Sequence, residues 1–418
     1  MRLLENGRLI CPHQNLDMVG HLIMDDGKIS SILPLTASTT TFKGERIDCT
    51  NKIITSGFSD VLAFGGLPDQ VHRENLNSLS NAALAGGFLH VGFGAERSYD
   101  TPSVIQDLCL QAQRQTGAHL YVIAALTRGL HGKELSEIGL MQRAGAIALF
   151  QSPVHDSSVL RRALQYARPF KCPVILRPAD LFLEAGGVMH EGKVATRIGL
   201  RGIPESAEVN GISTILNLAR ETECPVHLSH VTTARGVELV HRAKQEGLPV
   251  SAGVPARHLA LTDAFIEDSM YDTRGHLLPP LRPESDRLAL IDGVRERIID
   301  CVFANHTSCT RVEKEVEFAL SVPGAIGLET AGSVAYQNIA DPMTTFRALG
   351  FATKYIFGQE RSLSVDAPAD IVIFDPEAFW TPGPCYHSKG NNEPLEGMTM
   401  KGRVIASFIA GNWMYRKI

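Results

Sequence analysis

The segment Pro225–Ala252 carries the pattern that decides the fold. It begins with the short apolar run Pro225–Leu228 (PVHL), continues through the amphipathic stretch Arg235–Glu246, and ends in a second apolar run, Pro249–Ala252 (PVSA). Two short apolar runs joined by a helix-length amphipathic stretch are typical of parallel strands with a crossover helix, because parallel strands need a long connection. This segment therefore predicts a β-α-β unit.

The same pattern recurs toward the N-terminus, with apolar runs at Leu89–Phe93, Tyr121–Ala125, Ala146–Phe150 and Pro173–Leu176. About eight such units over roughly 300 residues predict a (β/α)8 barrel. A doubly wound parallel sheet is the alternative, but no glycine-rich nucleotide-binding fingerprint supports it. In a barrel, functional residues lie at the carboxyl ends of the strands, so we expect candidate site residues at those positions.

Both ends of the chain are rich in strand-like patterns, unlike the middle, where such patterns alternate with helical stretches. The turn Asp25–Gly27 separates two strand-like runs near the N-terminus, and Ala369–Asp375 and Gly402–Asn412 read as strands near the C-terminus. We therefore predict one small β-sandwich built from residues 1–55 and 356–418, with the barrel in residues 56–355.

Composition excludes several classes of function. The 418-residue chain is 44% hydrophobic and carries a net charge of −5, which gives no basic footprint for nucleic acid or an anionic membrane. The first residues have no signal-peptide pattern, and no apolar run approaches the length of a membrane span. The eight cysteines contain no Cys-x-x-Cys pair. A cytoplasmic protein with reduced thiols is expected.

Seven motifs are spread over nearly the whole chain. They are Gly57–Asp60, Thr127–Leu135, Glu184–Gly192, Gly199–Glu208, Pro279–Arg282, Gly327–Thr330 and Ser388–Gly397. These motifs resemble those of the dihydroorotase family, in the cyclic amidohydrolase superfamily. The resemblance implies a (β/α)8 barrel with a β-sandwich made from both chain ends. In active members it implies the reversible closure of carbamoyl-aspartate to dihydroorotate on one or two zinc ions.

The metal ligands that this resemblance implies are largely missing. The family's first barrel strand ends in Asp-x-His-x-His, whereas this chain has Asp60 followed by Leu62 and Phe64 at the two histidine positions. Neither side chain can donate an electron pair to a metal. A histidine ligand of a later strand corresponds to Arg177, whose guanidinium opposes a cation. Only His230 clearly matches a family ligand.

The residues that the resemblance assigns to proton transfer and substrate binding have also changed. The general base, an aspartate in the family, corresponds to Asn305, which cannot take up a proton at neutral pH. The arginine for the substrate carboxylate corresponds to Gly66. The two substrate-binding asparagines correspond to about Glu96 and to Leu278.

We therefore predict a protein that is not an enzyme, with no catalytic residue, no bound metal and no other cofactor. His230, His306 and Cys309 are the remnant candidates for a metal site. Catalytic zinc sites use about three protein ligands, so we expect these side chains to have structural roles.

The departures resemble those of the inactive dihydroorotase-like subunit that some bacteria associate with the catalytic chain of aspartate transcarbamoylase. This resemblance predicts a structural or assembly subunit of that enzyme in pyrimidine biosynthesis, within a hetero-oligomer and with a contact between copies of this chain. No nucleic-acid or membrane partner is expected. One alternative is an amidohydrolase that uses an altered metal site on another cyclic amide. The other is a sensor of a pyrimidine intermediate, against which Gly66 and Leu278 argue.

Overall fold

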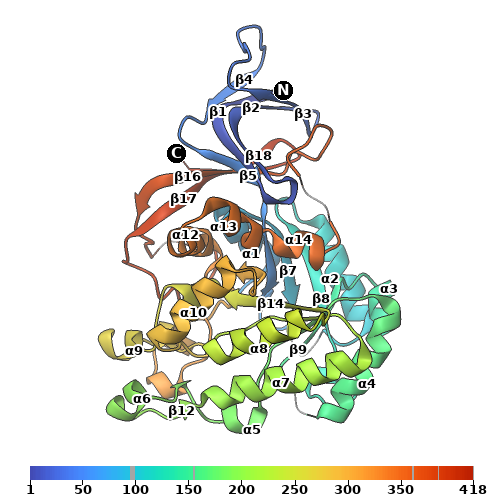
Figure 1. Ribbon diagram of the computed structural model, residues 1–418, viewed down its shortest axis with the longest axis vertical. Helices are drawn as coiled ribbons and strands as arrows, with labels where there is room; N and C mark the ends of the chain where they lie inside the picture. Colours follow the sequence, from blue (N-terminus) through green and yellow to red (C-terminus); the bar gives the residue numbers. More distant parts are fainter. Residues whose placement is uncertain (95–98, 154–155, 360–361, 385, 418) are drawn as a thin grey trace.

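The computed structural model describes residues 1–418 except 95–98, 154–155, 360–361, 385 and 418 (Figure 1). Its centre is a sheet of eight parallel strands in the spatial order β15-β14-β13-β10-β9-β8-β7-β6. The first and last strands meet, because Ala304 N donates to Asp60 Oδ2 at 2.6 Å and Phe64 N donates to His306 O at 2.8 Å. The predicted (β/α)8 barrel is therefore confirmed. Its strands are β6 (Phe58–Ala63), β7 (Phe88–Gly94), β8 (His119–Ala125), β9 (Ala148–Gln151), β10 (Val174–Leu176), β13 (Val226–Leu228), β14 (Val250–Pro255) and β15 (Cys301–Phe303).

Helices cover the outside of the barrel and begin at well-formed caps. The Asn75 side chain accepts from Ser78 N, Asp156 accepts from Ser158 N, and Thr233 accepts from Gly236 N. Such caps satisfy amide groups that have no partner within the helix. The long helices are α1 (Leu76–Ala85), α2 (Pro102–Arg114), α3 (Ile138–Arg143), α4 (Ser157–Ala167), α7 (Glu205–Thr222), α8 (Ala234–Gln245), α10 (Glu284–Arg295), α12 (Leu328–Ile339) and α13 (Pro342–Leu349).

Short helices and strands lie at the two ends of the barrel. Helix α14 (Phe351–Tyr355) contributes Phe351 to an apolar cluster inside the barrel that also contains Leu62 and Phe303. At the other end, away from the terminal β-domain, α5, α6 and α9 lie together (Figure 1). The elements of this end are α5 (Leu181–Glu184), β11 (Met189–His190), α6 (Lys193–Ile198), β12 (Gly202–Ile203), α9 (Ala264–Asp268) and α11 (Arg311–Lys314).

Both chain ends build the small β-domain at the top of Figure 1, as predicted. The strand order is β18-β17-β16-β5-β1-β2-β3, with β4 paired to β1. Alternating side chains such as Leu9, Leu22 and Phe408 form a core separate from that of the barrel. The strands are β1 (Arg2–Cys11), β2 (Leu16–Asp25), β3 (Lys28–Pro34), β4 (Glu45–Asp48), β5 (Ile53–Ser56), β16 (Ile371–Trp380), β17 (Met400–Ile409) and β18 (Asn412–Arg416).

The connection between β16 and β17 leaves the β-domain and packs on the barrel. Asn392 Nδ2 donates to Thr307 O at 2.9 Å, and Thr330 Oγ1 donates to Glu393 Oε2 at 2.7 Å. The motif Ser388–Gly397 therefore borders the loop that follows the last barrel strand. Among the described residues, we find no helix with the length and apolar character needed to cross a membrane.

Candidate functional site

The carboxyl end of β6 is apolar where the resemblance implies two histidine ligands. Leu62 is only 6% exposed and packs inside the barrel with Val61 and Phe150. Phe64 follows the strand, and its ring lies 4.6 Å from the Arg73 guanidinium carbon. These side chains are held by packing and a cation–π contact, so this strand end offers no metal ligand at either position.

Arg177 follows β10 and forms a buried, bidentate ion pair with Glu184. The distances are 2.6 Å from Nη1 to Oε1 and 2.7 Å from Nη2 to Oε2. Two parallel hydrogen bonds fix the guanidinium plane, and the side chain is almost fully buried. A fixed positive charge therefore stands where the resemblance implies a metal ligand.

His230, which follows β13, and Asn305, which follows β15, contact each other past the strand between them. His230 Nε2 lies 3.0 Å from Asn305 Oδ1, and His230 Nδ1 lies 2.7 Å from Ser229 Oγ. Burial lowers the pKa of His230 to about 3, which keeps the ring neutral. Because an amide oxygen only accepts, His230 Nε2 carries the proton and its lone pair is not offered to a metal.

His306 and Cys309 lie on the same loop but have different partners. His306 Nε2 is 3.0 Å from Glu74 Oε2, and its Nδ1 accepts from Gly327 N at 3.3 Å. The Cys309 thiol lies 3.3 Å from Arg73 Nη2, and burial raises its pKa. Together with His230, these residues form no cluster of three potential ligands within the described part of the chain.

Three further positions correspond to substrate contacts in the resemblance, namely Gly66, Leu278 and Glu96. Gly66 has a φ of +73°, and a Cβ there would lie 2.1 Å from Glu74 O, so the turn requires glycine. Leu278 is half-buried. Glu96 lies outside the described residues. Among the described residues, the donor set at the strand ends thus does not fit the zinc site that the resemblance implies.

A cavity of about 580 Å³ opens beside the loop that follows β15. Cys309 and Lys314 line it from this loop, and Arg274 and Lys389 line it from the facing segments. Burial lowers the pKa of Lys314 to about 8, and its Nζ donates to Thr273 O at 2.9 Å. Sequence reasoning named Cys309 as a candidate and included Lys389 in the motif Ser388–Gly397, but it assigned no role to Lys389, Lys314 or Arg274.

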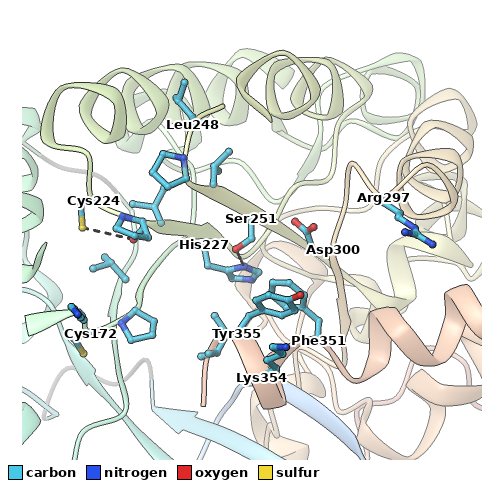
Figure 2. A pocket seen from close by; sticks show the side chains of 18 of the residues that line it. Cys172, Cys224, His227, Leu248, Ser251, Arg297, Asp300, Phe351, Lys354 and Tyr355 are labelled. Atoms are coloured by element: carbon cyan, nitrogen blue, oxygen red, sulfur yellow. Dashed lines mark hydrogen bonds between the residues drawn. The ribbon is translucent and has the colours of Figure 1, made fainter. Parts of the chain in front are cut away.

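A larger cavity, of about 940 Å³, lies at the opposite end of the barrel. Figure 2 shows His227 and Ser251 between the strands and Phe351 and Tyr355 below them. The cavity is lined by Val174, the first residue of β10, and by the first residues of β13 and β14. Barrel chemistry belongs to the carboxyl ends of strands, so this cavity is the weaker candidate for catalysis.

The structure also brings together His90, His119 and Asp370, whose potential ligand atoms all lie within 4.8 Å of one another. Sequence reasoning did not single out these residues. His90 and His119 pair in register on neighbouring strands, but Asp370 reaches them from the C-terminal part of the chain.

Comparisons with known proteins agree with this fold. A family model described as dihydro-orotase-like matches residues 67–235. A dihydroorotase from Anaeromyxobacter sp. (strain K) is 34% identical, with 99% of this chain and 98% of the relative covered. A dihydroorotase from Syntrophotalea carbinolica is 32% identical, with 99% of each covered. The solved L-hydantoinase (dihydropyrimidinase) from Arthrobacter aurescens superposes with a TM-score of 0.86 at 20% identity, covering 100% of this chain and 96% of that one.

These comparisons correct one prediction. The prediction that this chain is not an enzyme is wrong, because relatives at 32–34% identity over almost the whole chain are named as enzymes. The prediction equated the loss of one ligand set with the loss of all chemistry. The structure places other ionisable groups together, including Lys314 at a cavity and the cluster of His90, His119 and Asp370.

Proposed function

Because the chain belongs to the dihydroorotase-like family of the amidohydrolase superfamily, we propose that it hydrolyses a cyclic amide or ureide at a site that differs from the family's zinc site. The observation that carries this proposal is the cavity of about 580 Å³ beside the loop after β15. Its volume lies within the range of small-molecule sites, and its position at the carboxyl end of a strand is where barrel enzymes act.

The charges at this cavity are mixed, with a small excess of cations. The charged residues that line it are Arg274, Arg311, Lys314 and Lys389 beside Asp272, Glu315 and Glu396. The Arg274 guanidinium forms ion pairs with Asp272 and, at 3.2 Å, with Glu396. These two contacts orient the guanidinium. A cyclic ureide that carries a carboxylate, as the name dihydroorotase implies for the relatives, fits this combination.

Lys314 is the candidate for proton transfer. Hydrolysis needs a base that takes a proton from water while the water oxygen bonds to the carbonyl carbon. It then needs an acid that protonates the leaving nitrogen as the C–N bond breaks. A lysine with a pKa of about 8 is partly neutral near neutral pH, so its amine accepts the first proton and its ammonium returns that proton to the nitrogen.

We expect Lys314→Met to reduce turnover by about 10²–10⁴-fold, the usual contribution of general acid–base catalysis. In the unchanged protein the rate should rise with pH through about 8, because the neutral amine is the active base. The assay would use dihydroorotate and unsubstituted hydantoin, with chelator-treated protein. Lys171→Met, on an exposed lysine at the other end of the barrel, is the control. Full activity of Lys314→Met with an unchanged pH profile would refute this assignment.

A second candidate function is association with the catalytic chain of aspartate transcarbamoylase, which does not require this chain to be inactive. The observation that favours a protein partner is the exposure of large apolar side chains on short helices and loops at the end away from the β-domain. Phe182 is 84% exposed, Met270 85%, Val312 80% and Leu320 73%. Exposed apolar side chains gathered at one end of a protein are typical of interaction surfaces.

Co-expression with the transcarbamoylase catalytic chain, followed by size-exclusion chromatography with light scattering, tests this association. We expect one complex that contains both chains, and its amount should fall at least about tenfold for Phe182→Ser if that side chain is an interface anchor. Phe379→Ser is the matched control, because Phe379 is 70% exposed but lies on β16 in the β-domain. Two separate peaks for the unchanged chains would end this proposal.

A further inference from the structure

Two histidines and one aspartate meet where the barrel joins the terminal β-domain. His119 Nε2 lies 3.0 Å from Asp370 Oδ2, and His90 Nε2 lies 3.9 Å from the same oxygen. We propose that His90, His119 and Asp370 form a binding site for a divalent transition-metal ion, with zinc as the preferred ion. This site is distinct from the proposed active site, because it lies at the amino-terminal end of the barrel strands.

The strand register positions the two imidazoles. His90 on β7 pairs directly with His119 on β8, so both side chains leave the sheet on the same face. Their rings stack with centroids 4.7 Å apart. Asp370 immediately precedes β16 and belongs to the β-domain. The site therefore takes two ligands from one domain and one from the other.

Hydrogen bonds with neighbouring groups orient two of the three ligands, His90 and Asp370. His90 Nδ1 lies 3.0 Å from the Tyr121 hydroxyl, which leaves Nε2 directed at Asp370. The second carboxylate oxygen, Asp370 Oδ1, accepts from Ala410 N at 2.9 Å. Hydrogen bonds of this kind fix ring orientation and carboxylate direction in known metal sites.

Access to the site also fits. His90 and Asp370 are buried, whereas the His119 side chain is 37% exposed. The partly exposed His119 ring provides an entry path, and it must turn out of the stack with His90 to bind an ion.

The ligand chemistry selects the class of ion. Imidazole nitrogen suits zinc, copper and nickel, whereas calcium and magnesium require mostly oxygen ligands. Two histidines and one carboxylate leave a fourth tetrahedral position for water. Bonds of about 2 Å to each ligand require donor atoms a little over 3 Å apart. In the cluster, Asp370 Oδ2 lies 3.0 Å from His119 Nε2 and 3.9 Å from His90 Nε2, so the ligands must shift slightly to bind an ion. The bound ion would join the barrel to the β-domain.

Zinc titration of the chelator-treated full-length protein by calorimetry tests this site. We expect one equivalent to bind, and Co²⁺ in place of zinc should give the visible absorption of a tetrahedral site. His119→Ala and Asp370→Asn should weaken binding by at least about 100-fold, and Tyr121→Phe by about 10–100-fold. His241→Ala, on an exposed histidine of α8, should bind as the unchanged protein does.

The remaining outcomes are equally informative. Failure of the unchanged protein to bind one equivalent of zinc would leave only a His–Asp ion pair and overturn the proposal. So would a His119→Ala protein that binds as tightly as the unchanged one. The thermal midpoint without metal shows whether His119→Ala still folds, and zinc should raise that midpoint only when the site is intact.

Discussion

The free energy of unfolding should fall steeply as the pH drops below about 6.5, because five buried histidines are neutral in the folded protein. Burial lowers the pKa to about 3 for His227, His230 and His258, and to about 4 for His190 and His276. The unfolded chain takes up these protons near pH 6.5, well before the folded protein does. Their contribution to stability is thus complete above pH 6.5 and is lost as the pH falls toward 4 and 3.

The expected size of this effect is large. At pH 5 each of these histidines has lost about 2 kcal/mol of stabilisation, so their sum is about 10 kcal/mol. Typical domains have a net stability of only about 5–15 kcal/mol. We therefore expect the protein to unfold near pH 5. Urea unfolding at pH values from 8 down to 5, followed by circular dichroism, measures this dependence.

A single substitution identifies the source of the acid sensitivity. His258→Gln removes one proton-binding site and retains a donor toward Pro280 O, which lies 3.2 Å from His258 Nε2. The slope of stability against pH should become shallower by about 1.2 kcal/mol per pH unit between pH 6 and 5. His241→Gln on the protein surface should leave the slope unchanged. An unchanged slope for His258→Gln would show that this histidine is protonated in the folded protein.

The fold was predictable because burial leaves a local pattern in the sequence. The apolar run Pro225–Leu228 became β13, and the amphipathic stretch Arg235–Glu246 became α8 with boundaries one residue away. The two β-rich chain ends also formed one domain, as expected. Each of these predictions rests on residues that are neighbours along the chain.

The candidate sites were harder to predict because their residues come from distant segments. Asp370 and His119 are 251 positions apart in the sequence, and no local pattern predicts their contact. Lys314 has a lowered pKa mainly because folding buries it. Sequence reasoning compared Leu62 and Asn305 with known positions of a metal ligand and a general base. Such a comparison tests only for zinc-dependent chemistry of that kind and cannot detect a different site.

Arg177→Met should destabilise the protein by about 3–5 kcal/mol, the usual cost of breaking a buried ion pair from one side. The substitution leaves Glu184, whose side chain is 12% exposed, without its bidentate partner. In the double variant Arg177→Met with Glu184→Leu, both charges are gone and stability should return close to that of the unchanged protein. Urea unfolding at pH 7.5 of the two single variants and the double variant measures the coupling.

The surface pair of Arg161 and Glu221 is the matched control, since its side chains are 44% and 50% exposed. Solvent screens such pairs, so Arg161→Met should change stability far less than Arg177→Met does. Equal effects of the two substitutions would show that Arg177 is hydrated and free to move. Recovery in the double variant would show that the charge of Glu184, and not the shape of Arg177, makes arginine necessary after β10. The position where the family places a metal ligand would then be held by an ion pair internal to this chain.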